Sequence, residues 1–229
     1  MSTPPKAIRA VVFDAYGTLF NVHSVVETCE MLFPGKGNAL SQLWRSKQLE
    51  YSWLRSLMGC YVDFSQITRE SLQFACESLG LPFSDMALAR LDAAYRALAL
   101  FDDTLPVLQQ LQNSLPTVKR AILSNGAPEM LNAVVTHNKI GKLFDAVLSV
   151  DAVGVFKPDR RVYQLCTERL DVKPGEIAFV SSNGWDAAGA KAFGFTTFWI
   201  NRSSGPVEQL GVTPDRVLKS LAELPAQIS

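Results

Sequence analysis

Four clusters of polar residues lie at or just after the ends of short apolar segments, and their residue types suit nucleophilic chemistry. The first cluster is Asp14 with Thr18. The other three are Ser124 with Asn125, then Lys157, then Ser181, Ser182 and Asn183 with Asp186. Asp14 alone would equally suit a turn cap, which is a common use of Asp. The presence of four such clusters favours a nucleophilic Asp14 over a turn cap. A carboxylate is a weak nucleophile, but it suffices when the leaving group is good.

The apolar segments that carry these clusters have the composition of buried parallel strands. Val11, Val12 and Phe13 form one such run, which a turn signal at Gly17 follows. Similar segments occupy residues 121–125, 146–150, 177–183 and 196–200. Helical patterns separate them, which predicts an α/β fold with a doubly wound, Rossmann-like parallel sheet. Because the carboxyl ends of the strands meet at one edge of such a sheet, the polar clusters should converge there.

Further elements are expected near the end of the chain and after two of the predicted strands. We expect residues 196–200 to form the last strand, followed by a short amphipathic helix near Asp215. A helix is expected to begin near Pro128 and another near Asp186. Each of these helices would follow a strand and complete a crossover unit.

Residues 21–98 show no convincing strand and predict an all-helical insert. Four helices are expected, over residues 24–33, 38–58, 65–79 and 84–98. Asn38 and Ser84 are candidate N-caps, and Gly59 and Gly80 lie just past two helix ends. We therefore expect a core domain of residues 1–20 and 99–229 and a cap domain of residues 21–98 over the strand edge.

The helix expected over residues 38–58 is apolar on two faces. The residues of one stripe share helical spacing and a core-packing character: Leu40, Leu43, Trp44, Tyr51, Leu54 and Met58. The second face carries Arg45, Leu49 and Trp53 at i, i+4 and i+8. A helix apolar on two faces is usually sandwiched, which would turn the second face toward Asp14. The pattern alone, however, favours a solvated Arg45.

Charge and composition exclude several classes of function. Lys+Arg and Asp+Glu both number 22, which argues against a nucleic-acid partner, because such proteins carry a basic patch. No segment approaches the roughly 20 apolar residues of a membrane helix, and the N-terminus lacks the apolar core of a signal peptide. We therefore expect a soluble, cytoplasmic protein without a membrane partner. Four cysteines without a Cys-x-x-Cys pair are expected to be reduced thiols.

Three segments resemble the haloacid dehalogenase superfamily, and its L-2-haloacid dehalogenase branch in particular. They are DAYGT at residues 14–18, LWRSKQLEYSWLRSLMG at residues 43–59 and SSNGWDAAGAKAFGF at residues 181–195. The resemblance covers nearly the full chain. Most members of the superfamily are phosphatases, which carry a second Asp where this chain has Tyr16 and an acid that helps to hold magnesium where it has Ser182.

The resemblance implies an enzyme that hydrolyses short-chain L-2-haloalkanoic acids to D-2-hydroxy acids without a metal or other cofactor. Asp14 would displace the halide with inversion, and water would hydrolyse the resulting ester. A halide leaves without protonation, whereas the alkoxide of a phosphate ester needs a proton, and Tyr16, with a reference pKa of about 10, is a poor donor at neutral pH. A magnesium-dependent phosphatase of the same superfamily is the alternative. The resemblance also implies a homodimer, formed through the cap helices.

Each residue of the predicted site receives a role from the resemblance. The residues expected to act on the nucleophile, the halide, the substrate carboxylate and the water are Asp14, Thr18, Arg45, Ser124, Asn125, Lys157, Tyr163, Ser181, Asn183 and Asp186. Arg45 and Asn125 would stabilise the leaving halide. The residues expected to line the substrate's apolar pocket are Tyr16, Leu49, Phe64 and Trp185. For these four, simple core packing is the alternative, because aromatic and apolar side chains are usually just buried.

Overall fold

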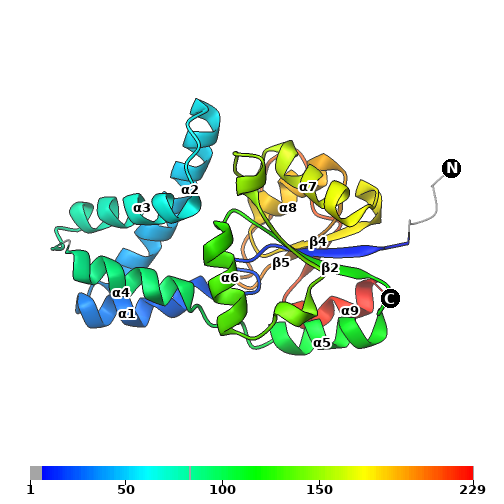
Figure 1. The fold of residues 1–229 in the computed structure, drawn as a ribbon, viewed down its shortest axis with the longest axis horizontal. Helices are drawn as coiled ribbons and strands as arrows, with labels where there is room; N and C mark the ends of the chain where they lie inside the picture. Colours follow the sequence, from blue (N-terminus) through cyan, green and yellow to red (C-terminus); the bar gives the residue numbers. More distant parts are fainter. Residues whose placement is uncertain (1–6, 83, 229) are drawn as a thin grey trace.

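The computed structural model describes residues 7–82 and 84–228 and shows a parallel sheet between helices, with a separate group of helices to one side (Figure 1). The expected core and cap domains include residues 1–6, 83 and 229, which lie outside the described residues. The sheet has six strands in the order β3-β2-β1-β4-β5-β6. Their bounds are β1 (Ala10–Phe13), β2 (Lys119–Ser124), β3 (Ala146–Ser149), β4 (Ile177–Ser181), β5 (Thr196–Ile200) and β6 (Arg216–Leu218).

All neighbouring strands are parallel, and the predicted α/β fold is confirmed. Strands β1 and β4 are buried along their whole length, as parallel strands covered on both faces must be. Phe13 of β1 pairs with Ile122 of β2 on one side and with Val180 of β4 on the other. This register brings the ends of the three central strands to one level, directly before Asp14.

The helices of the sheet-bearing part are α5 (Thr104–Ser114), α6 (Pro128–His137), α7 (Arg160–Leu170), α8 (Gly184–Phe193) and α9 (Pro225–Ile228). Figure 1 shows α7 and α8 on one face of the sheet and α5 and α9 on the other. Short 3-10 helices occupy Val22–Val25, Gly141–Leu143, Val150–Ala152, Pro174–Glu176 and Leu221–Glu223. Helix α6 begins at Pro128 as predicted, whereas α8 begins two residues before the predicted Asp186.

The prediction that β5 is the last strand, followed by a helix near Asp215, is wrong. Strand β6 follows Asp215 and pairs with β5. The Asp215 carboxylate accepts hydrogen bonds from the Thr197 backbone N–H at 2.8 Å and from Lys191 Nζ at 2.6 Å. These long-range bonds bring a three-residue segment alongside β5, and a segment this short carries too little periodicity to be recognised in sequence.

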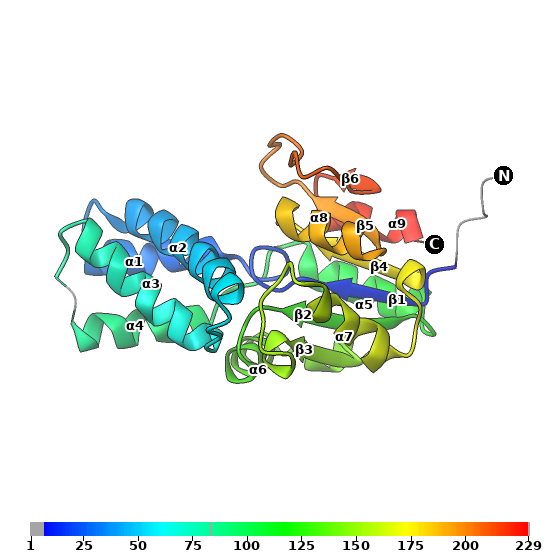
Figure 2. The same ribbon diagram turned by 90° about the horizontal axis from the view of Figure 1, so that it is seen from above.

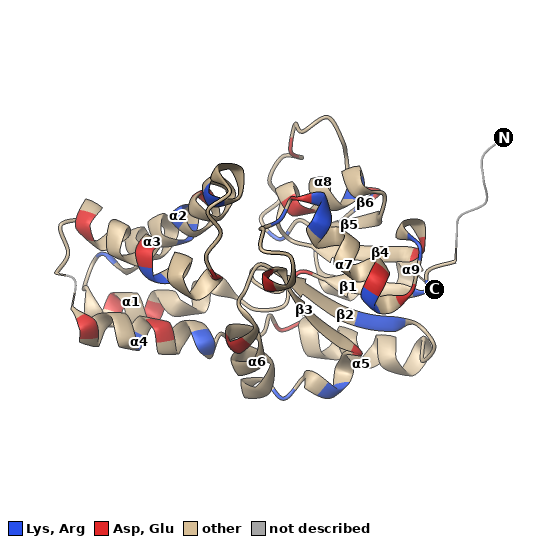
Figure 3. Ribbon diagram, turned by 45° about the horizontal axis from the view of Figure 1, so that its top comes forward, with Lys and Arg blue, Asp and Glu red and all other residues tan. Residues whose placement is uncertain are grey.

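The four helices of the insert are α1 (Val26–Leu32), α2 (Gly37–Met58), α3 (Phe64–Ser78) and α4 (Asp85–Arg96). They lie beyond one end of the sheet in both ribbon views (Figures 1 and 2). Charges of both signs are dispersed over the insert and the sheet-bearing part (Figure 3). No helix among residues 7–82 and 84–228 is long and apolar enough to cross a membrane.

Helix boundaries in the insert follow the predicted caps with one exception. The Ser84 hydroxyl accepts a hydrogen bond from the Ala87 N–H, and Gly59 ends α2 with φ = 67°. Asn38, however, is not an N-cap, because α2 begins at Gly37. Glu30 of α1 instead accepts a hydrogen bond from the Gly37 N–H at 2.8 Å and so serves one of the free backbone donors at this helix start.

The predicted core stripe of α2 holds as far as Tyr51, which packs against the core, and fails at the C-terminal end of the helix. Leu40 and Trp44 are buried, whereas Leu54 and Met58 are 43% and 66% exposed. The last turns of α2 extend past the other insert helices in Figure 1. Ser56 in these turns accepts a hydrogen bond from the Phe156 N–H at 3.0 Å, but the apolar side chains of Leu54, Leu57 and Met58 stay exposed. An exposed apolar group on a helix end is a candidate for a contact with another molecule.

The insert joins the sheet-bearing part through two chain segments that run side by side. Phe20 forms an antiparallel bridge with Leu100. The Asn21 N–H donates to the Ala99 carbonyl at 2.8 Å, and the Phe101 N–H donates to the Leu19 carbonyl at 3.0 Å. The insert therefore departs from and returns to the end of β1 at a single place.

Asp103 ties this junction to the far edge of the sheet. Its carboxylate accepts from both terminal nitrogens of Arg202, at 2.8 and 2.9 Å, and from the Leu221 N–H at 2.9 Å. Arg202 also donates to the Thr18 carbonyl at 3.2 Å. The Asp103 carboxylate therefore fixes an arginine that also touches the turn after β1.

We predict that Asp103→Asn lowers the free energy of unfolding by about 1–3 kcal/mol, because an amide cannot accept both Arg202 bonds. Urea unfolding followed by circular dichroism measures the change. The matched control is Asp102→Asn, since Asp102 is exposed and makes no described side-chain bond. Equal stability of the two variants would contradict the prediction.

Candidate active site

The Asp14 carboxylate lies at the centre of the strand edge and is held by three side chains. Its Oδ2 accepts hydrogen bonds from Thr18 Oγ1 at 2.9 Å and from Asn183 Nδ2 at 2.8 Å. Its Oδ1 accepts from Lys157 Nζ at 3.0 Å. Gly17 forms the turn that brings Thr18 close to Asp14. Its φ of 90° is a backbone conformation that residues with a Cβ atom rarely adopt. Three chain segments thus fix one nearly buried carboxylate.

The Lys157 ammonium lies between two buried carboxylates. Its Nζ is 3.0 Å from Asp14 Oδ1 and 2.8 Å from Asp186 Oδ2, and its side chain is 1% exposed. The second oxygen of Asp186 accepts from the Tyr163 hydroxyl at 2.8 Å. Every charged group in this row therefore has a partner, which buried charges require.

Burial and charge oppose each other in this row. Burial alone would lower the pKa of Lys157, but attraction to Asp14 and Asp186 outweighs it, and the pKa lies above its usual value. Burial and the nearby Asp14 raise the pKa of Asp186 to about 6 although Lys157 acts in the opposite direction. Burial also raises the pKa of Tyr163 well above its usual value, so this phenol stays a hydrogen-bond donor.

The remaining predicted polar residues hold the loops at the strand edge. Asn125 Oδ1 accepts from the Lys157 N–H at 3.0 Å, and Ser124 Oγ accepts from the Gly126 N–H at 3.0 Å. Ser181 Oγ accepts from the Asn183 N–H at 3.1 Å. The sheet edge therefore brings the loops after β1, β2 and β4 and the loop before α7 into one network.

A small cavity of about 10 Å³ lies over Asp14. The residues that line it come from both the sheet-bearing part and the insert: Asp14, Tyr16, Arg45, Leu49, Phe64, Ser124, Asn125, Asn183 and Trp185. Five predicted residues do not line it and lie behind Asp14 or beside it: Thr18, Lys157, Tyr163, Ser181 and Asp186. The structure therefore brings all predicted site residues together in two layers, with Asp14 at their boundary.

The second face of α2 closes this cavity from above. Arg45 and Leu49 line it, and Trp53 packs edge-on against Trp185 with ring centroids 5.3 Å apart. The Tyr16 hydroxyl is buried and has no hydrogen-bond partner among the described residues, and burial raises its pKa. The indole N–H of Trp185 is likewise buried without a partner in the described chain. These donors at the cavity wall are free to serve a bound molecule.

Tyr95 and Gln48 lie next to this site, and neither of them was predicted from the sequence as a site residue. Tyr95 of α4 packs against the Tyr16 ring at 5.6 Å, and its hydroxyl donates to Gln48 Oε1 at 3.0 Å. Leu91 and Tyr95 are four residues apart, a spacing typical of ordinary core packing. The only available signal was a polar Gln48 one turn from Arg45, next to the predicted second face of α2.

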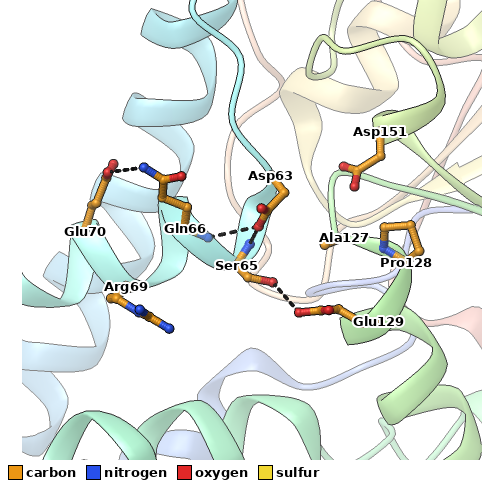
Figure 4. A pocket seen from close by; sticks show the side chains of 9 residues that line it. All are labelled: Asp63, Ser65, Gln66, Arg69, Glu70, Ala127, Pro128, Glu129 and Asp151. Carbon is orange, nitrogen blue, oxygen red and sulfur yellow. Dashed lines mark hydrogen bonds between the residues drawn. The ribbon is translucent and has the colours of Figure 1, made fainter. Parts of the chain in front are cut away.

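A larger, open cleft separates the insert from α6 and has a different character. Its volume is about 630 Å³, and Figure 4 shows Asp63, Ser65 and Glu129 facing each other across it. Ser65 Oγ donates to Glu129 Oε1 at 3.2 Å, and Tyr61 donates to Asp151. None of the predicted site residues lines this cleft. It is the boundary between the insert and the sheet-bearing part.

The sequence of this chain matches the model of the haloacid dehalogenase-like hydrolase family over residues 8–194. The chain belongs to this family. It is 47% identical to the (S)-2-haloacid dehalogenase H-109 of Pseudomonas putida, covering 96% of this chain and 97% of that one. It is 50% identical to the (S)-2-haloacid dehalogenase of Pseudomonas sp. strain YL, covering 93% and 91%.

A solved structure of the family also superimposes closely. It is the L-2-haloacid dehalogenase of Xanthobacter autotrophicus with chloropropionic acid covalently bound. The TM-score is 0.90 at 43% identity, and the match covers 96% of this chain and 98% of the other. In the present chain, the described residues include no group of three or more His, Cys, Asp or Glu side chains that could hold a metal ion.

We predict that Lys157→Met lowers the free energy of unfolding by about 3–5 kcal/mol at neutral pH, because it leaves two buried carboxylates without their cation. Without Lys157 the pKa of Asp186 rises above about 6, so the folded state binds a proton that the unfolded state has released. A raised carboxyl pKa makes stability fall as pH rises. The deficit relative to the wild type should therefore be larger at pH 8 than at pH 5.

Chemical unfolding at both pH values tests this prediction. Lys142→Met is the matched control, because Lys142 is exposed and has no described ion pair. A deficit that did not change with pH would contradict the proposed electrostatic cause, even if the variant were less stable.

Proposed function

We propose that this family member hydrolyses the carbon–halide bond of short-chain L-2-haloalkanoic acids and releases D-2-hydroxy acids. The observation that carries the proposal is the Asp14 carboxylate beneath a small cavity that Arg45 closes from the insert. The names of the relatives, (S)-2-haloacid and L-2-haloacid dehalogenases, support the substrate class. We treat residues 21–98 as a cap domain that contributes this arginine.

In the first proposed step, one carboxylate oxygen of Asp14 attacks C2 of the substrate opposite the halogen. A carbon–oxygen bond forms with inversion, the carbon–halogen bond breaks, and the halide leaves with the bonding electron pair. Arg45 and Asn125 line the cavity and would donate hydrogen bonds to the departing anion. Ser124, with nearby backbone N–H groups, would bind the substrate carboxylate.

In the second step, water attacks the carboxyl carbon of the Asp14 ester. The ester bond breaks, the hydroxy acid leaves, and the Asp14 carboxylate is regenerated with release of one proton. Ser181 and Asn183 would orient this water together with Asp186. Thr18 holds one Asp14 oxygen and Lys157 the other, while Tyr163 and Asp186 hold Lys157 in turn. The cation lowers the repulsion between Asp14 and an incoming carboxylate.

The alkyl group of the substrate would occupy the space between Tyr16, Leu49, Phe64 and Trp185. A cavity of about 10 Å³ holds no more than about one water molecule. We therefore propose that the described conformation is closed and that the cavity widens to admit substrate. A movement of the cap about its paired connection to β1 would achieve this.

We propose that the reaction needs no metal, in contrast to the magnesium-dependent phosphatase alternative. The Lys157 ammonium lies between Asp14 and Asp186 and balances part of their negative charge. Tyr16 and Ser182 supply no carboxylate at the two positions that carry acids in phosphatases of the superfamily. A phosphate dianion would meet Asp14 without a metal to shield it.

We also propose that the chain forms a homodimer through the exposed end of α2, where Leu54, Leu57 and Met58 lie. An apolar group of this kind on a helix end is typical of an interface. The cytoplasmic location stays a prediction.

Halide release from L- and D-2-chloropropionate, with EDTA present, is the experiment that tests the function. We expect chloride from the L-isomer only, and no phosphate from p-nitrophenyl phosphate with magnesium. Asp14→Asn should abolish chloride release, with an unchanged circular dichroism spectrum, because an amide is not a nucleophile. Unaltered turnover in this variant would contradict the proposed mechanism. Phosphate release that EDTA abolishes would favour the magnesium-dependent phosphatase alternative.

The dimer has its own test in Leu57→Glu, which places a charge on a side chain that is 84% exposed. We expect sedimentation equilibrium to show a dimer for the wild type and a monomer for this variant. Met86→Glu is the matched control, because Met86 is 67% exposed and belongs to the first turn of α4, a different helix of the insert. A monomeric wild type would contradict the proposed dimer.

A further inference from the structure

We infer that Tyr95 is a positioning residue that holds the Arg45 guanidinium over Asp14. The inference deepens the proposed function and rests on it, since it concerns the group that receives the halide. Tyr95 lies on the last turn of α4, and Arg45 lies on α2. The two residues therefore come from different helices of the insert and meet only in the folded chain.

The side chain of Arg45 runs between two small cavities of similar size. One is the cavity over Asp14. The other, also of about 10 Å³, is lined by Arg45 together with Ser41, Gln48 and Tyr95 among others. Tyr95 thus shares a cavity with Arg45, but it does not line the cavity over Asp14. Its position thus suits support of the arginine rather than contact with substrate.

The hydrogen bonds around Tyr95 have a defined direction. Its hydroxyl donates to Gln48 Oε1 at 3.0 Å, and Gln48 Nε2 donates to Thr68 Oγ1 at 3.0 Å. A phenol has one proton to donate. Because Tyr95 donates that proton in its hydrogen bond to Gln48, its oxygen can only accept further hydrogen bonds. Arg45 has only donors. The bond to Gln48 therefore turns the Tyr95 oxygen into an acceptor for the arginine.

The network is buried and hydrogen-bonded throughout. Tyr95, Gln48 and Thr68 are all buried, and the Tyr95 ring packs against Trp44 at 5.3 Å and against Tyr16 at 5.6 Å. The Trp44 indole N–H donates to the Thr68 carbonyl at 2.8 Å. Polar groups in an apolar core are unfavourable unless each is hydrogen-bonded. A buried network with a free acceptor beside the cavity that Arg45 also lines has the geometry that positioning requires.

The neutrality of Tyr95 matters as much as its place. Arg45 makes no ion pair with any carboxylate of the described residues. A carboxylate in the place of Tyr95 would fix the guanidinium equally well but would compensate its charge. A phenol oxygen fixes the guanidinium and leaves its full positive charge for the anion that develops on the other side.

The test is Tyr95→Phe, which keeps the ring and its packing and removes the acceptor. We expect kcat for L-2-chloropropionate to fall about 10–100-fold, the effect of losing one hydrogen bond to a charged group. KM should change by less than about threefold, because the halide carries its charge only in the transition state. The loss should be smaller with L-2-bromopropionate, since bromide is the better leaving group. Tyr51→Phe is the matched control on α2 and should retain wild-type turnover.

A double-mutant cycle with Arg45→Lys separates positioning from general structure. If Tyr95 acts through the guanidinium, Tyr95→Phe should lower kcat by less than about twofold in the Arg45→Lys background, because coupled residues are not additive. An equal loss in both backgrounds, or no loss in either, would overturn the inference while leaving halide release by the wild type intact. A wild type that released no halide would instead contradict the proposed function.

Discussion

The ion row of Asp14, Lys157 and Asp186 is the interaction on which the rest of the structure depends. Two buried carboxylates share one buried ammonium, so the row carries a net negative charge in a place that water hardly reaches. Such a row is tolerated only where every oxygen and proton has a partner. Thr18, Asn183 and Tyr163 supply those partners, and they come from the turn after β1, the loop after β4 and helix α7. The order of the strands is what brings these three segments together.

The same charge balance explains why the site needs a contribution from the insert. An anionic substrate that approaches Asp14 meets a row that is already negative. Arg45 is the cation on the opposite wall of the cavity, and it comes from α2 rather than from the sheet. The aromatic rings of Phe64, Tyr16 and Tyr95 lie next to one another across this boundary, with centroids 6.2 and 5.6 Å apart. The insert and the sheet-bearing part are therefore packed together at the place where chemistry is proposed.

Much of the fold and of the candidate site followed from local pattern, and the exceptions share a cause. Apolar runs ending in polar residues marked β1, β2 and β4, and cap residues such as Ser84 marked helix starts. Strand β6 was not predicted, because Asp215 holds it in place through hydrogen bonds to residues distant in the sequence. Leu54 was assigned to the core because helical spacing does not reveal where a neighbouring helix ends. Tyr95 has the spacing of a core residue, and only the folded chain shows that it lines the same small cavity as Arg45.

The paired connection at Phe20 and Leu100 has a consequence for how such a chain can change. Because the insert leaves and returns at adjacent points, its two ends are already close, and none of the strand pairings involves a residue between them. A segment of different length or topology could be grafted at this position without disturbing the order of the strands. The ion row would be inherited unchanged, and the graft would decide which cation or donor faces it. Selectivity and the nucleophile can thus evolve separately within a single gene.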